Sequence, residues 1–111
     1  MTERFQLESE IEAVVRGFET CSTDKSSFKH KDHLTVAVVY LQALTIADAV
    51  ERIRAALLAF LDHHGVPREK YNEEVTVFWM EQVASMLAEL PDDSSLVDKC
   101  NYVIESSVSR R

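Results

Sequence analysis

The stretch TIADAVERIRAALLAFLDHHG, residues 45–65, decides the fold class, because it forms one complete helix pattern with both ends marked. Thr45 is a typical N-cap, and Asp48 follows three residues later as a short capping-box partner. Gly65 supplies the left-handed residue that ends many helices. The apolar residues between these ends recur at helical spacing, and we expect them to be buried: Ile46, Ala49, Val50, Ile53, Leu57, Phe60 and Leu61.

On either side of this helix, four other segments have apolar residues at the same helical spacing. We expect a first helix over residues 7–20, a second over about 30–43, a fourth that starts between 67 and 72, and a shorter fifth capped by residues 91–94, with a frayed tail from 106. Their predicted core positions are Leu7, Ile11, Val14, Val15 and Phe18; Leu34, Ala37, Val38, Leu41 and Leu44; Val75, Phe78, Trp79, Val83, Met86, Leu87 and Leu90; and Leu96, Val97, Cys100 or Val103, and Ile104. Short connections favour antiparallel neighbours, so the sequence predicts an all-α protein: a compact bundle of about five helices, as a single domain over residues 1–111.

The composition of the chain argues against several classes of function. A net charge of −7 argues against nucleic-acid binding, which requires a basic surface. No apolar run approaches the roughly 20 residues of a membrane span, and the first ten residues have no apolar signal core. The only cysteines, Cys21 and Cys100, show no CxxC spacing and are interpreted as free thiols in a reducing compartment; a single disulfide between them is the alternative. We therefore expect a cytoplasmic protein without nucleic-acid or membrane partners.

Two short motifs concentrate the residues capable of chemistry. The first, FKHKDHL at residues 28–34, places His30 and His33 one turn apart on one face of the second helix, near its core stripe. Imidazoles that point toward an interior need partners. The partner of each ring is either a divalent transition metal, for which imidazole is a common ligand, or a carboxylate or backbone carbonyl.

The second motif, KYNEEVT at residues 70–76, begins the fourth helix. Tyr71 and Asn72 fall on its core side, and Asn72 is also a suitable N-cap. Glu73 and Glu74 flank that side, where acidic residues commonly stabilise a first helical turn. Thr76 lies one turn after Glu73 and is expected either to hydrogen-bond with it or to pack.

If the two motifs meet, His30, His33 and Glu73 form a candidate polar site. It is either a metal site with these three residues as ligands and an open coordination position, or an acid–base site with the histidines as proton shuttles and Glu73 as general base. In that site Tyr71 is the expected hydrogen-bond donor. Asn72, Thr76 and His64 are further residues expected to line it. A simpler account of His63 and His64 is their favourable position at the negative end of the third helix.

The alternative is a non-enzymatic interaction or dimerisation module. In that interpretation the histidine and glutamate cluster only ties two helix starts together through buried hydrogen bonds. The module would use an exposed apolar patch, on the first or fifth helix, for a homodimer or a protein partner.

The two motifs also resemble those of a family of small bacterial all-helical proteins of unassigned function. One family motif is F-x-H-x-x-H followed by Leu or Val, and the other is K-Y-H-E-T-[IV]-T. The matching positions here are Phe28, His30, His33, Leu34 and Ala37 for the first motif, and Lys70, Tyr71, Glu73, Val75 and Thr76 for the second.

This resemblance spans about residues 28–80. It implies an all-helical fold and a shared site at His30, His33 and Glu73. Asn72 stands where the family pattern has His, and Glu74 where it has Thr. If that His is a metal ligand, this chain lacks it, and Glu74 could replace it only if the start of the helix is rotated.

Overall fold

The computed structural model describes residues 5–109 and confirms the all-α fold; this part of the chain contains no strand. Five α-helices and one short 3-10 helix follow one another along the chain. Their bounds are α1 Glu8–Glu19, α2 His30–Ala43, α3 Ile46–His63, η1 Arg68–Lys70, α4 Glu73–Ala88 and α5 Leu96–Ser109.

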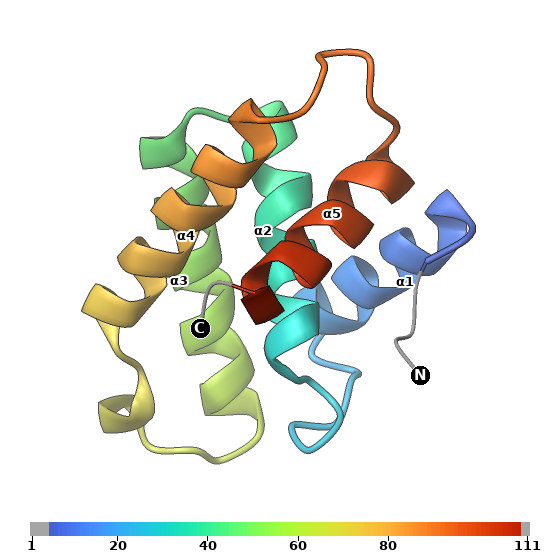
Figure 1. Ribbon diagram of the computed structural model, residues 1–111. Helices are drawn as coiled ribbons and strands as arrows, with labels where there is room; N and C mark the ends of the chain where they lie inside the picture. The colour runs from blue at the N-terminus through green and yellow to red at the C-terminus, as the bar shows by residue number, and fades with distance from the viewer. Residues whose placement is uncertain (1–4, 110–111) are drawn as a thin grey trace.

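Helix α2 occupies the centre of the bundle and contacts every other α-helix. Helices α3 and α4 lie on one side of it and α1 and α5 on the other (Figure 1). In the same view α2, α3 and α4 run up, down and up, as their short connections predicted. This arrangement places the start of α4 beside the start of α2, with the C-terminal half of α3 next to both.

The central position of α2 explains its burial pattern. The five consecutive residues Leu34, Thr35, Val36, Ala37 and Val38 are all buried. A helix surrounded by partners has no solvent-facing side, so it is apolar on most of its circumference. The sequence analysis assigned α2 a single core stripe and therefore did not predict that Thr35 and Val36 are buried.

The predicted helix ends are largely confirmed. Thr45 Oγ1 accepts a hydrogen bond from the Asp48 N–H at 3.2 Å. Gly65 has a φ of 69°, as expected for the residue that ends α3. The fifth helix differs from the prediction: Ser95 caps it by accepting from the Asp98 N–H, and it continues to Ser109 instead of fraying at 106.

Four residues predicted to be buried are exposed: Leu7 by 63%, Ile46 by 48%, Val75 by 51% and Phe78 by 52%. Leu7 is the N-cap of α1 and Ile46 is the first residue of α3. Phe78 is two residues from buried Met80, so it lies about 200° around α4 from the packed face. Met80 was not predicted as a core residue, yet it is 1% exposed.

Neither thiol is paired in this structure. Cys100 is fully buried in α5, and burial raises the pKa of its thiol to about 12. Cys21 follows α1 with a φ of 59°, a left-handed conformation, and is partly buried. Among the helices within residues 5–109, none is long and apolar enough to cross a membrane.

Candidate functional site

A pocket of about 300 Å³ opens where α2, α3 and α4 meet. Its walls are mostly apolar, with Leu34 and Ala37 from α2, Ile53 and Leu57 from α3, and Trp79 and Met80 from α4 among the residues that line it. The polar residues of the lining come from the two predicted motifs: His30, His33, Lys70, Tyr71, Asn72 and Thr76. The two motifs therefore do meet, as the sequence analysis expected of a site.

The start of α2 is held in place from both sides. Phe28 stacks on Phe18 of α1, with ring centroids 4.6 Å apart, and packs on Phe60 of α3 at 5.3 Å. One residue later the Lys29 N–H donates to the Asp32 carboxylate at 2.9 Å, which satisfies one of the free donors at the helix start. This anchoring fixes the first turn of α2, and with it the two histidines, at the pocket.

The two histidines have different surroundings. The His30 ring makes an edge-to-face contact with the Trp79 ring, 4.6 Å between centroids, and so joins α2 to α4. The His33 ring packs edge-on against Phe28 at 4.5 Å. Burial, and secondarily the nearby His30, lowers the pKa of His33 below 6.5, against weaker opposing effects of a Lys29 backbone hydrogen bond and the Asp32 charge. At neutral pH, His33 is therefore an uncharged imidazole in the pocket wall.

The start of α4 is fixed by its own motif. The Asn72 side-chain oxygen accepts from the Val75 N–H at 3.1 Å, which confirms the predicted N-cap. The Thr76 hydroxyl donates to the Asn72 carbonyl at 3.0 Å, rather than to Glu73. These bonds are internal to the turn. They hold Tyr71 and Asn72 at the pocket edge.

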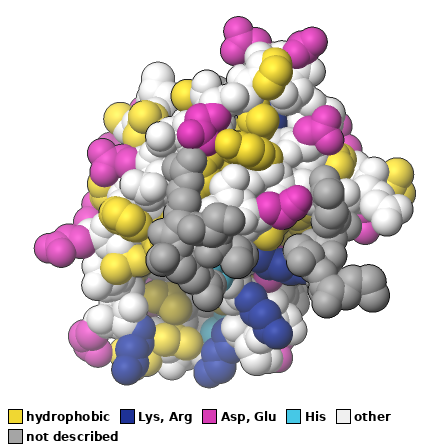
Figure 2. Space-filling view, in the orientation of Figure 1, with side chains coloured by type: hydrophobic (Ala, Val, Ile, Leu, Met, Phe, Trp, Pro, Cys, Tyr) yellow, Lys and Arg dark blue, Asp and Glu magenta, His cyan; other side chains and the backbone are white. Residues whose placement is uncertain are grey.

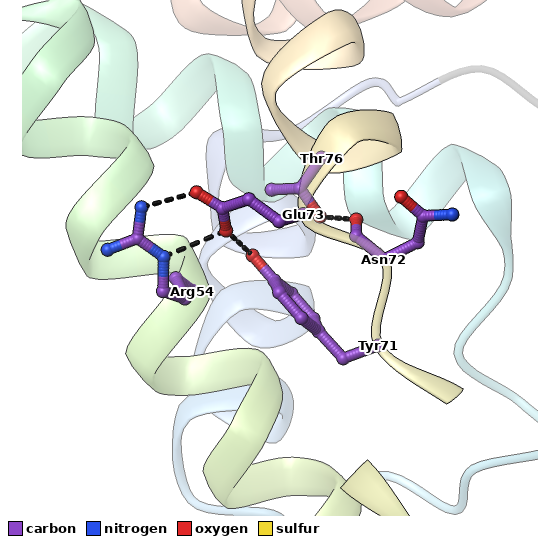
Figure 3. A network of polar contacts seen from close by, with 5 residues as sticks. All are labelled: Arg54, Tyr71, Asn72, Glu73 and Thr76. Carbon is purple, nitrogen blue, oxygen red and sulfur yellow. Dashed lines mark hydrogen bonds and ion pairs between the residues drawn. The ribbon is translucent and has the colours of Figure 1, made fainter. Parts of the chain in front are cut away.

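Glu73 belongs to a polar network at this edge (Figure 3). Arg54 reaches across from α3 and binds the Glu73 carboxylate through two parallel hydrogen bonds, Nε to Oε1 at 2.8 Å and Nη2 to Oε2 at 2.5 Å. The Tyr71 hydroxyl also donates to Oε1, at 2.6 Å. Hydrogen bonding by Arg54, then by Tyr71, lowers the pKa of Glu73 to about 2. Glu73 is thus ionised and fully engaged.

The predicted metal set of His30, His33 and Glu73 is consequently not assembled. The two histidines line the pocket, but Glu73 is not among the lining residues, because Arg54 and Tyr71 hold its carboxylate. Within residues 5–109, no group of three or more His, Cys, Asp or Glu side chains is arranged to hold a metal ion. Tyr71 is a hydrogen-bond donor, as expected, but its acceptor is Glu73.

His64 lies apart from this pocket. It forms the C-cap of α3, and its ring packs on Phe60 at 4.4 Å and on His63 at 5.0 Å. Its Nε2 atom is buried and has no hydrogen-bond partner in the part of the chain that the structure describes. The prediction that His64 lines the same cavity as the two motifs is therefore wrong.

Sequence reasoning missed two contributors. Arg54 lies off the core stripe of α3 and 19 residues before Glu73, so no local spacing connects the pair. Trp79 was interpreted as core, whereas it forms part of the pocket wall and contacts His30. Its position one turn after Thr76 was the only indication that its ring reaches the site.

No family model, no curated protein sequence and no solved structure matches this chain. The resemblance to the small bacterial family therefore stays a prediction, and function has to be argued from the pocket alone.

Proposed function

We propose that this protein binds a small, largely apolar organic molecule in the pocket between α2, α3 and α4. The observation that supports the proposal is the combination of a cavity of about 300 Å³, apolar walls, and polar side chains gathered from two helix starts. Ligand sites typically have this composition: apolar lining gives affinity, and a few polar groups fix orientation. The uncharged, partly desolvated His33 adds a group whose pKa is perturbed, which is common at functional sites.

The metal form of this hypothesis has weaker support than the organic-ligand form. His30 and His33 both reach the pocket, but the third predicted ligand is held by Arg54. The family motif's additional His is Asn72 here. A metal would thus depend on two imidazoles, fewer protein ligands than zinc sites ordinarily have.

The single tryptophan of the chain makes the proposal directly testable. Trp79 lines the pocket, so its fluorescence reports on occupancy there without any label. We expect saturable changes in Trp79 emission on titration with octanamide, a neutral molecule with an apolar chain. Titration with Zn²⁺ in the same assay tests the metal form.

A variant that fills the cavity is the matched test of location. Ala37→Leu places extra volume into the lining of the pocket, whereas Ala43→Leu adds the same volume at an exposed position on the same helix. We expect the first substitution to weaken octanamide binding and the second to leave it unchanged. Equal binding by both variants, with helix content intact by circular dichroism, contradicts a ligand site in this pocket.

The interaction-module alternative has one observation of its own. Val75 and Phe78, one turn apart on α4, are both about half exposed. The apolar patch was expected on the first or fifth helix; besides this pair on α4, Leu7 at the start of α1 is exposed by 63%. Sedimentation velocity of the wild type and of Phe78→Ser tests this candidate. Concentration-dependent association that the substitution removes would support a homodimer formed through α4.

A further inference from the structure

We infer that the pocket selects ligands with an anionic group on an apolar body, with Lys70 as the residue that binds the anion. A carboxylic acid with a hydrocarbon chain is the chemical class that fits. This inference rests on the proposed function, because it names the ligand of the same pocket.

The charge of the pocket lining is opposite to that of the molecule. The chain carries 19 acidic against 12 basic residues. Among the lining residues that the structure describes, however, none is Asp or Glu, and Lys70 carries the one permanent positive charge. In Figure 2 most Lys and Arg side chains lie in the lower half of the view, near histidine and hydrophobic surface, whereas acidic side chains spread over the upper and left parts. A local positive field of this kind favours anionic over neutral ligands.

Lys70 differs from the other cations near the site in being unpaired. Arg54 is engaged by Glu73, and Arg68, two residues before Lys70, is bound by Asp62 through two hydrogen bonds of 3.1 and 2.7 Å. Within residues 5–109, the ammonium group of Lys70 has neither a hydrogen bond nor an ion pair. It therefore does not have to leave a protein carboxylate in order to bind one from a ligand.

The nearest acidic side chain of the motif does not oppose an anion. Glu73 lies three residues from Lys70, but its charge is offset by the two parallel hydrogen bonds from Arg54. In the same turn, the Asn72 side-chain oxygen is used by the Val75 N–H, which leaves its NH₂ group as the donor. Figure 3 shows the Asn72 amide pointing away from Glu73 and Arg54. A carboxylate beside Lys70 thus has a second donor within the same segment.

The remaining walls determine the other part of the ligand. Leu34, Ile53, Leu57, Trp79 and Met80 present hydrocarbon and aromatic surface to the cavity. Transfer of alkyl groups from water to such a surface is favourable, and the gain grows with each buried CH₂ group. A purely inorganic anion makes no use of this surface, so the geometry favours an amphipathic acid.

The test compares two probes of nearly equal shape, octanoate and octanamide, which differ in charge. The full chain is titrated with each by isothermal calorimetry and by Trp79 fluorescence. We expect wild type to bind octanoate more tightly than octanamide. Lys70→Gln should weaken octanoate binding by about tenfold, the effect of losing one charge-assisted hydrogen bond, and leave octanamide unchanged.

Two matched variants test whether octanoate binding depends on the charge at Lys70 or on the net charge of the protein. Lys25→Gln makes the same charge change at an exposed loop position outside the lining, and should bind both probes as wild type does. Lys70→Arg retains the positive charge and should restore the preference for octanoate. The preference should also shrink as ionic strength rises, because Lys70 is exposed.

The outcomes distinguish this inference from the proposed function. Equal affinity of wild type for octanoate and octanamide, or equal weakening of both by Lys70→Gln, overturns the anion preference and leaves the apolar ligand site standing. Absence of saturable binding by either probe overturns the proposed function, and the present inference with it.

Discussion

Two triads, each made of a tyrosine, an arginine and a glutamate, lie in regions of the molecule that differ in burial. Beside the pocket, Tyr71 and Arg54 bind the carboxylate of Glu73. On the other side of α3, the Tyr40 hydroxyl donates to Glu19 at 2.6 Å, and Arg52 binds the same oxygen at 3.2 Å.

The second group joins α1, α2 and α3 as a packed structural unit. The Tyr40 ring is only 5% exposed, and the Arg52 guanidinium lies over it, 5.2 Å from the ring centroid. Burial, followed by the bond to Glu19, raises the pKa of Tyr40 to about 12. In the first group the ring of Tyr71 instead lines a cavity. The comparison shows that the surroundings of the ring, rather than the polar contacts, decide whether such a triad stabilises a core or shapes a site.

Truncation of each tyrosine should separate the two regions most clearly. We expect Tyr40→Ala to lower the free energy of unfolding by about 3 kcal/mol, because it leaves a cavity in the core. Tyr71→Ala should cost only about 1 kcal/mol, since its ring borders a pocket that is already open. Urea denaturation followed by circular dichroism measures both. Similar losses for the two variants would mean that both triads are structural.

The acid stability of the pocket triad gives a second test. The pKa of Glu73 is about 2 in the folded state, below its ordinary value of 4.5. Its ionised form therefore stabilises the fold fully above pH 4.5, and the contribution is lost as the pH falls toward 2. We expect the stability difference between wild type and Glu73→Gln to shrink over that range, as measured by urea unfolding at successive pH values.

A second variant tests whether Arg54 is the residue that lowers the pKa of Glu73. Because Arg54 supplies the main hydrogen bonds, Arg54→Met should show most of the same loss of pH dependence. Added salt should reduce the effect in wild type, since both side chains are partly exposed. A pH dependence that persists unchanged in Arg54→Met would assign the effect to another group.

The smallest expected effect is the titration of His33. Burial lowers its pKa, so its ring should remain neutral to a pH below 6.5. Protonation then costs more in the folded than in the unfolded state, and stability should fall slightly as the pH drops below 6.5. Proton NMR of the imidazole Cε1–H measures the midpoint directly. A midpoint at or above 6.5 would show that the pocket wall is solvated at His33.

Much of the local structure could be predicted from sequence. Caps at Thr45 and Asn72 and the left-handed Gly65 depend on contacts within a few residues, and all three are confirmed. The meeting of the two motifs was a condition of the predicted site, and both motifs do line one pocket at the starts of α2 and α4. The three features at the helix ends are local.

The failures all involve contacts between elements. An amphipathic pattern assigns one buried face per helix, so it misplaced Phe78 and did not predict the burial of Val36 in central α2. The predicted metal site of His30, His33 and Glu73 is not formed, because Arg54, 19 residues away in sequence, binds Glu73. His64 was misplaced because the end of α3 directs its ring onto Phe60 instead of into the pocket.

The sequence by itself thus determined the number of α-helices, several of their ends, and which polar residues gather at their starts, because the relevant interactions span only a few residues along the chain. Only the tertiary structure decided which helix is central, which carboxylate is neutralised, and that the histidines open onto an apolar cavity beside an unpaired lysine. Those properties depend on which faces pack together, and packing joins residues whose separation along the chain carries no periodic pattern.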